Sequence, residues 1–296
     1  MRDGIVKIGV MAPASRIDPS LADRVTALAH KIYPEQPPQI IFHSQCFEES
    51  GHFAGNDEAR ARAFIELANN ASFDALWFAR GGYGSCRLGA RLLPALTAAA
   101  RRKTYLGYSD AGSLLAGLYR QGFPRVAHGP MPSDLNRSDG ETAVARALRF
   151  LVEGEPGTLE PTLSSSTATA AFNITILSNL LGTPLEPDLS DHILMLEEVS
   201  EHMYRIDRAL FHITSNPSIR RVAGIKLGRC SDILPNEPNF GQTEEEVAKH
   251  WCSVSGIPYL GRADIGHDIG NKVVPFGRWL EWHNSGTRGE TDGHGS

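Results

Sequence analysis

Residues 103–122 read KTYLGYSDAGSLLAGLYRQG, and this stretch joins a strand-like run directly to a helix-like run. Residues 104–107 favour a buried strand, whereas the leucines that follow recur at helical spacing. Ser109 and Asp110 stand between the two runs. A strand that leads at once into a helix is half of a βαβ unit, so the stretch predicts a parallel sheet with helices packed on it.

The same pattern repeats on both sides of this stretch. Strand-like runs bounded by Gly, Pro, Asn or Asp are expected at 6–13, 39–45, 73–82, 103–110 and 125–131. Helix-like runs are expected at 21–33, 57–70, 85–100, 111–122 and 141–154. This alternation predicts an α/β fold, in which functional groups gather where the parallel strands end.

The second half of the chain differs from the first in composition and in its pattern of predicted elements. Residues 155–170 are rich in Pro, Ser and Thr and predict a linker, and a strong strand (192–199) and a helix (204–216) follow. Short strand-like runs beyond them predict a smaller, β-rich α+β domain. We therefore divide the chain into an N-terminal parallel-sheet α/β domain (1–154), a linker (155–170), a C-terminal domain (171–284) and a polar, Gly-rich tail expected to be disordered (285–296).

Composition narrows the class of protein. The chain has 296 residues, 41% hydrophobic and 21% charged, and a net charge of −5, which are values of a globular protein without the basic footprint of nucleic-acid binding. We expect no membrane segment and no secretory signal, because no apolar run is long enough and the N-terminus begins as a strand. Four widely spaced cysteines without a CxxC pair predict neither disulfides nor a structural metal site, and they fit the cytoplasm.

Ser109 is a candidate nucleophile because of its place between strand and helix. A tight turn there would expose its hydroxyl above the sheet, near the unpaired N–H groups and the positive dipole end of the helix. The N–H of Asp110 could then donate to an oxyanion. The alternative is that Ser109 and Asp110 only cap the helix, and Ala111 replaces the second glycine of a G-x-S-x-G motif.

A glycine-rich turn, ARGGYGS at residues 79–85, follows the preceding strand. Glycines let a ligand approach the backbone closely, so this turn could supply an oxyanion donor or hold an anion. It matches neither the Walker A motif nor the dinucleotide-binding fingerprint. The alternative is a plain strand-to-helix turn, but in either case it shares a sheet edge with Ser109.

An acid and a histidine come from the second half. The apolar strand 192–199 ends in Glu197 and Glu198, and a buried carboxylate needs a partner. Among the histidines, His267 lies in a glycine-flanked loop, whereas His128 ends the fifth expected strand. The residues alone leave both histidines open, because a catalytic triad is recognised by geometry and not by order along the chain.

Seven segments carry these candidates, and they are VKIGVMAPAS (6–15), ALWFARGGYGSCRL (75–88), YLGYSDAGSLL (105–115), HGPM (128–131), LSNLLGTP (177–184), ILMLEEVSEHMYRIDRAL (193–210) and GHDIGNKVVPFG (266–277). In this order they resemble the LD-carboxypeptidase family, which includes murein tetrapeptide carboxypeptidases and microcin-immunity peptidases. Two features depart from the family pattern: residues 171–174 read AFNI, and Glu198 stands where relatives tend to carry Asp. The first leaves the substrate preference open.

The resemblance implies a serine peptidase that needs no metal or organic cofactor and often forms a homodimer. It assigns Ser109 as nucleophile, His267 as base and Glu197 as the acid that orients the histidine. It places the oxyanion on the backbone N–H groups of Gly82 and Asp110. The active-site cleft would lie between the two domains.

The resemblance leaves two substrate types, and a murein tetrapeptide that loses its terminal D-alanine is the one we favour. A carboxypeptidase must bind a terminal carboxylate, for which Arg80 and Arg205 are candidates, unless each only forms a structural ion pair. The other type, peptidyl or aminoacyl nucleotide analogues, calls for an aromatic platform for the base. No tryptophan lies between residues 78 and 250, since the four are Trp77, Trp251, Trp279 and Trp282.

Two further classes are weighed against this enzyme. A non-catalytic ligand-binding protein could keep the same fold, although the presence of all three triad candidates argues against it. A metallopeptidase lacks support because the chain has no HExxH motif.

Overall fold

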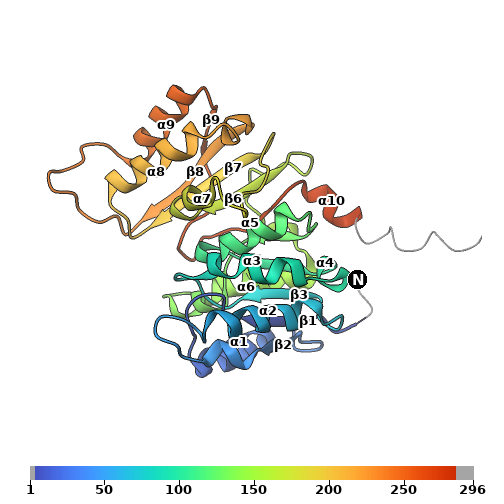
Figure 1. Cartoon of the computed structure of the whole chain (residues 1–296). Helices are drawn as coiled ribbons and strands as arrows, with labels where there is room; N and C mark the ends of the chain where they lie inside the picture. Colours follow the sequence, from blue (N-terminus) through green and yellow to red (C-terminus); the bar gives the residue numbers. More distant parts are fainter. Residues whose placement is uncertain (1–3, 285–296) are drawn as a thin grey trace, which may run out of the picture.

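The computed structural model describes residues 4–284, and it contains two separate sheets (Figure 1). The first has six strands, and all of them run parallel except β10, which is antiparallel to its neighbour β5. In spatial order they are β10 (Val274–Pro275), β5 (Val126–His128), β4 (Thr104–Gly107), β3 (Ala75–Phe78), β1 (Lys7–Met11) and β2 (Gln39–Phe42).

Helices cover both faces of the first sheet. The helices α1 (Pro19–Ile32) and α6 (Glu141–Glu153) share one core cluster with strand residues such as Val10 and Trp77. On the other face lie α2 (Asp57–Asn69), α3 (Gly89–Leu92), α4 (Ala98–Arg101) and α5 (Gly112–Arg120). The helices α1, α2 and α6 each bury one apolar stripe, as the helical spacing in the sequence predicts. The helix α5 is instead buried all round over residues 112–118. The three-layer arrangement confirms the α/β fold class.

The expected helix 85–100 is broken into pieces. A 3₁₀ turn (Ser85–Arg87) precedes α3, and a second 3₁₀ turn (Leu93–Ala95) separates α3 from α4. Pro94 lies in the second turn and has no backbone N–H to continue a helical ladder. The apolar pattern of this region therefore remains, but it is distributed over short turns.

The second sheet has four strands, β6 (Thr169–Asn173), β7 (Ile193–Val199), β8 (Gly224–Ser231) and β9 (Tyr259–Arg262), all parallel. Helices α7 (Ile174–Leu180), α8 (Met203–Ser215) and α9 (Glu244–Ser255) connect them. This unit is therefore itself α/β, and the expected β-rich, α+β character is wrong. The helix α9 escaped detection because it buries only Val247, Ala248 and Cys252, which is a weak apolar pattern.

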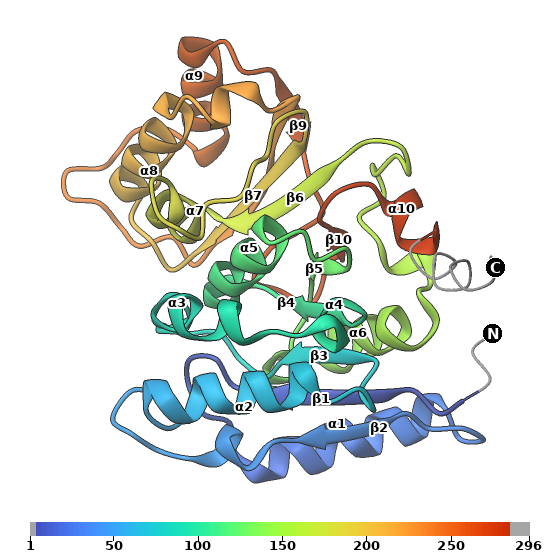
Figure 2. The same cartoon turned by 45° about the vertical axis from the view of Figure 1, so that its right-hand side comes forward.

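The two sheets are joined by packing and by the returning chain. One core cluster includes α5 and the helix-covered side of the second sheet, and Figure 2 shows α5 beneath α7. Strand β10 pairs with β5, and α10 (Trp279–Asn284) packs on Phe150 of α6. Residues 171–284 thus contribute to both units, and β6 begins at Thr169, inside the expected linker. The tail expected to be disordered (285–296) lies outside the described residues.

Between residues 4 and 284, no helix combines the length and the apolar character that crossing a bilayer requires.

Candidate active site

Ser109 lies in a strained turn between β4 and α5. Its φ is 56°, in the left-handed region that side-chain-bearing residues rarely adopt, at a cost of roughly 1–3 kcal/mol. The turn is tight, because a Cβ added to Gly107 would lie 2.7 Å from Phe78 Cδ2 and 3.3 Å from Ala111 Cβ. The small residues Gly107 and Ala111, two positions before and two after Ser109, therefore permit the bend. Alanine is small enough at the position where a G-x-S-x-G motif has its second glycine.

The side chain of Asp110 ties the serine turn to the glycine turn. Its carboxylate accepts hydrogen bonds from the N–H groups of Gly84 (3.2 Å) and Ser85 (2.9 Å), and the Ser85 hydroxyl donates to its carbonyl. Burial raises the pKa of the Asp110 carboxyl, although these hydrogen bonds oppose the shift. A Cβ on Gly81 would come within 2.8 Å of Ser109 Oγ. Only glycine at 81 leaves the hydroxyl its space, a role that the sequence did not reveal.

Glu197 reaches the site from a bulge in β7. The register between β7 and β8 shifts between Leu196 and Glu198, and such bulges re-aim side chains at functional sites. Consecutive strand residues point to opposite faces, so Glu197 and Glu198 separate. Gly228 on β8 makes room, because a Cβ there would lie 3.0 Å from Glu197 Cβ.

His267 forms a buried pair with Glu197. The distance from His267 Nδ1 to Glu197 Oε2 is 2.5 Å, and the two residues are 7% and 0% exposed. In the neutral ring, an Nδ1–H that donates to Glu197 leaves Nε2 unprotonated, and Nε2 has no hydrogen-bond partner among residues 4–284. Burial alone would lower the pKa of His267, but the charge and hydrogen bond of Glu197 outweigh it and raise that pKa.

One pocket brings the serine and the histidine together. It lies at the carboxyl ends of the first sheet's strands, and its lining residues are Arg80, Gly81, Gly82, Tyr108, Ser109, Met131, Ser133, Asp134, Asn136, Arg137 and His267. Of the residues predicted for the site, Ser109, His267, Gly82 and Arg80 line it, while Glu197 stands behind His267. Backbone N–H groups of Gly82 and Asp110 as oxyanion donors stay a prediction.

The pocket also contains residues that sequence reasoning missed. Asp134 accepts hydrogen bonds from Tyr108 Oη (2.7 Å) and Arg137 Nε (3.1 Å), and the Tyr108 ring lies 4.8 Å from that of His267. The signal available was position alone: Asp134 and Arg137 follow the fifth strand at the same sheet edge as Ser109. Arg137 thus adds a second guanidinium to the pocket beside Arg80.

The rival candidates have other partners. His128 is fully buried with Nε2 3.1 Å from Asn271 Oδ1, and burial lowers its pKa. Glu198 accepts hydrogen bonds from Asn173 Nδ2 (2.5 Å) and from the Thr175 backbone (2.9 Å), so it holds the start of α7. Neither side chain lines the Ser109 pocket.

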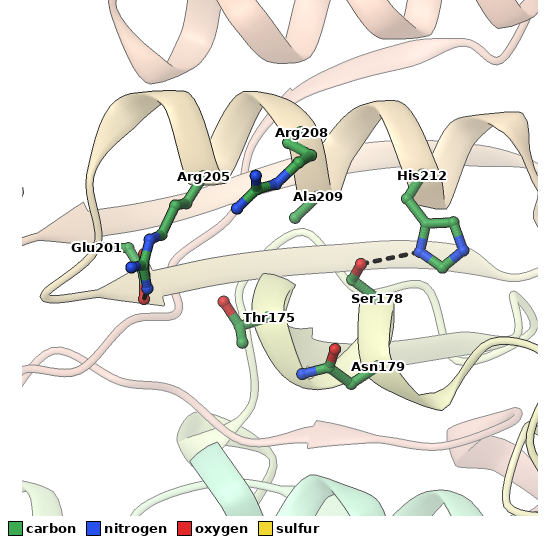
Figure 3. Close-up of a pocket in the computed structure, with 8 residues that line it drawn as sticks. All are labelled: Thr175, Ser178, Asn179, Glu201, Arg205, Arg208, Ala209 and His212. Atoms are coloured by element: carbon green, nitrogen blue, oxygen red, sulfur yellow. Dashed lines mark hydrogen bonds and ion pairs between the residues drawn. The ribbon is translucent and has the colours of Figure 1, made fainter.

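Arg205 belongs to a different pocket, between α7 and α8 (Figure 3). The helix α8 directs it outward, where Nε bonds Tyr204 Oη at 3.0 Å and Nη1 lies 3.5 Å from Glu201. Figure 3 shows Arg205 and Arg208 of α8 on the side of the pocket opposite Thr175 of α7. Ser178 of α7 and His212 of α8 are joined by a hydrogen bond of 3.0 Å. No residue lines both pockets, so the geometry does not support Arg205 as a ligand of substrate at Ser109.

The chain matches two family models, the LD-carboxypeptidase N-terminal domain over residues 8–129 and the LD-carboxypeptidase C-terminal domain over residues 169–281. A carboxypeptidase-named protein of Synechocystis sp. is 31% identical over 255 residues, which are 82% of this chain and 81% of that protein. The murein tetrapeptide carboxypeptidase of Pseudomonas aeruginosa is 26% identical over 77% of this chain and 78% of its own length.

Among solved structures, the microcin C7 self-immunity protein in complex with aspartyl sulfamoyl adenosine has the same fold. Its TM-score is 0.76 at 17% identity, over 93% of this chain and 92% of that one. Both halves of the chain therefore match one family, and the α/β fold agrees with it. The chain belongs to the LD-carboxypeptidase family and is a serine carboxypeptidase.

Proposed function

We propose that this carboxypeptidase removes the terminal D-alanine from murein tetrapeptide during cell-wall recycling, with Ser109, His267 and Glu197 as its triad. The observation that carries the proposal is the buried Glu197–His267 pair next to the pocket that Ser109 lines. The name of the Pseudomonas aeruginosa relative supports the substrate.

The proposed reaction uses the two ring nitrogens of His267 differently. Ser109 Oγ attacks the carbonyl of the bond to D-alanine while Nε2 takes the hydroxyl proton. The same nitrogen then gives this proton to the leaving amine, and an acyl-enzyme remains on Ser109. Water next attacks the ester, Nε2 again carries the proton, and the shortened peptide leaves. Glu197 holds the Nδ1–H tautomer and stabilises the imidazolium.

The backbone N–H groups of Gly82 and Asp110 would stabilise the oxyanion in both steps. The glycine turn supports this role because Gly82, with a φ of 117°, lines the pocket beside Ser109. The hydrogen bonds that Gly84 N and Ser85 N donate to the Asp110 carboxylate hold the two donor segments together. Donors held in place before substrate binds would need no reorganisation during the reaction.

A nucleotide-type substrate is the second candidate, since the microcin C7 self-immunity protein shares the fold. The aromatic side chains argue against it. Trp77 is fully buried and donates to Pro130 O, whereas Trp251 packs on Phe211. The only Phe, Tyr or Trp side chain that lines the described pocket is Tyr108, and at 2% exposed it offers little surface on which a base could stack.

Incubation of the purified enzyme with murein tetrapeptide, followed by quantification of free D-alanine, tests the substrate. We expect release from tetrapeptide, and the same assay with tripeptide and pentapeptide defines the length preference. If no D-alanine is released and an aminoacyl sulfamoyl adenosine is cleaved instead, the substrate is of the nucleotide type. Tight peptide binding with no turnover on any of these compounds would favour the non-catalytic alternative.

Arg80 and Arg137 are the proposed ligands of the terminal carboxylate. Both line the Ser109 pocket, and Arg137 is braced by Asp134. Replacing either by methionine should raise KM for tetrapeptide by about 10–100-fold with a smaller change in kcat, because a hydrogen bond to a charged group is lost. For a tetrapeptide with a terminal amide, these substitutions should raise KM little further, because that substrate lacks the carboxylate that the arginines would bind. Arg205→Met is the matched control, and an equal KM effect there would contradict the assignment.

We also propose a cytoplasmic enzyme that forms a homodimer. All four cysteines are free thiols, which suits a reducing compartment. The dimer rests on the family resemblance, and sedimentation analysis of the purified chain tests it.

A further inference from the structure

The loop that carries His267 wraps around one arginine of the neighbouring strand. Arg229 on β8 donates from Nη1 to Asp264 Oδ1 (2.6 Å) and from Nη2 to Asp268 Oδ1 (2.9 Å), and its Nε donates to Asp268 Oδ2. The two carboxylates stand on either side of His267 in the sequence. The bidentate contact with Asp268 fixes direction as well as distance, because both partners are planar.

The backbone of the loop is shaped to the guanidinium. Arg229 N donates to Ile265 O at 2.8 Å, so the loop starts directly beside this residue. A Cβ on Gly266 would lie 3.0 Å from Arg229 Cβ, and one on Gly270 would lie 3.0 Å from Arg229 Nη2. The glycines before and after His267 therefore let the chain close over the arginine.

The same strand also sets the position of the acid. Gly228, next to Arg229, packs against Glu197 and Ile265, with 3.0 Å from an added Cβ to Glu197 Cβ and 2.7 Å to Ile265 Cγ1. Two adjacent residues of β8 thus locate both members of the Glu197–His267 pair. A shift of the loop on Arg229 would change the 2.5 Å contact between them.

Other contacts hold the loop at its edges. Arg146 Nη1 donates to the carbonyls of Ile269 (2.9 Å) and Asn271 (2.7 Å), and Glu160 Oε1 accepts from Asp264 N (3.1 Å). These contacts reach backbone atoms. The Asp268 carboxylate also accepts a hydrogen bond from Gly270 N at 2.8 Å, within the loop itself. Among residues 4–284, the side-chain ion pairs of Asp264 and Asp268 are both with Arg229, so its guanidinium is the group that ties these two carboxylates to β8.

We propose that Arg229 is a positioning residue for catalysis, which binds Asp264 and Asp268 and thereby holds His267 against Glu197 and toward Ser109. The inference rests on the proposed roles of His267 and Ser109. Arg229 itself does not line the pocket, so it acts through the loop and not on substrate.

The variant Arg229→Lys tests the geometry without changing the charge, because an ammonium cannot bind two carboxylates as a planar fork does. We expect kcat on tetrapeptide to fall roughly 10–100-fold with KM nearly unchanged, the scale of loss from a small misplacement of a catalytic group. Asp268→Glu, which also keeps the charge, should act in the same direction and serves if Arg229→Lys fails to fold. The matched control is Arg262→Lys, because Arg262 lies on the adjoining strand β9 and forms a surface ion pair with Glu244 of α9.

The second readout is the titration of His267, followed by NMR in the Ser109→Ala background so that no turnover is needed. Arg229→Lys should lower the pKa of His267, because a looser pair loses the contribution of Glu197 while burial remains. The other groups facing the ring, which are Glu198, Tyr108, His128 and Asp134, are unchanged in this comparison.

The outcomes separate this inference from the proposed function. A lower melting temperature with unchanged kcat and unchanged His267 titration would make Arg229 merely structural and overturn the inference. A wild-type enzyme without activity on tetrapeptide would instead contradict the proposed substrate, while the NMR result would still decide the role of Arg229.

Discussion

Ser109→Ala should lower kcat on tetrapeptide by about 10⁴–10⁶-fold, with KM close to that of the wild type. The acyl-enzyme cannot form without the hydroxyl, and the pocket that binds the peptide stays intact. The backbone cost of the turn should be nearly the same in both proteins, because serine and alanine each carry a Cβ at the left-handed φ of 56°. Steady-state kinetics of the purified variant, with circular dichroism to verify the fold, measure the effect.

Covalent labelling gives a second measurement of the same prediction. A fluorophosphonate probe should modify the wild-type enzyme on Ser109, and Ser109→Ala should lose this adduct. Ser178→Ala, in the pocket between α7 and α8, is the matched serine control and should label as the wild type does. Retention of more than a tenth of wild-type turnover in Ser109→Ala would show that the nucleophile is another residue.

His267→Ala should cause a loss of similar size, because the base and the nucleophile act as a unit. In the wild-type enzyme, the role of His267 as the base should be visible in the pH dependence of the rate, because the pKa of this histidine is raised. The base must be neutral, so kcat/KM should fall as the pH drops through this pKa, which is raised from the ordinary histidine value of about 6.5. Rate profiles between pH 5 and 9, roughly the interval over which histidine titrates, measure it.

Glu197→Gln provides the discriminating variant for this second prediction. Without the carboxylate charge, burial becomes the main influence on the pKa of His267 and lowers it. The acid limb of kcat/KM should therefore move to lower pH. We expect kcat to fall less than in His267→Ala. His128→Gln distinguishes the rival histidine, whose partner is Asn271. If His128→Gln lost several orders of magnitude while His267→Ala stayed active, the assignment of the base would have to be reversed.

The segments that carry the candidate site residues could be located from the sequence, because each of them combines a local hydrophobic pattern with a place at the end of a predicted strand or in a glycine-flanked loop. The run KTYLGYSDAGSLL predicts a strand, a turn and a helix by spacing alone, and the structure has β4, the Ser109 turn and α5 there. The same holds for ARGGYGS after β3 and for the acid pair at the end of β7. Alternation of period-2 and period-3.6 patterns is a local property, so it survives folding unless Pro or Gly interrupts it, as in residues 85–100.

The tertiary structure alone decided which of two adjacent residues takes part in the site and which distant segments come into contact. Glu197 and Glu198 are indistinguishable by composition, but the bulge in β7 directs one to His267 and the other to α7. The sequence alone determined that a serine turn, a glycine turn, a strand-end acid and a histidine loop exist in an α/β protein. That Arg137 joins the pocket, that Arg205 lies elsewhere and that Arg229 holds the histidine loop depend on long-range packing, which no local period encodes.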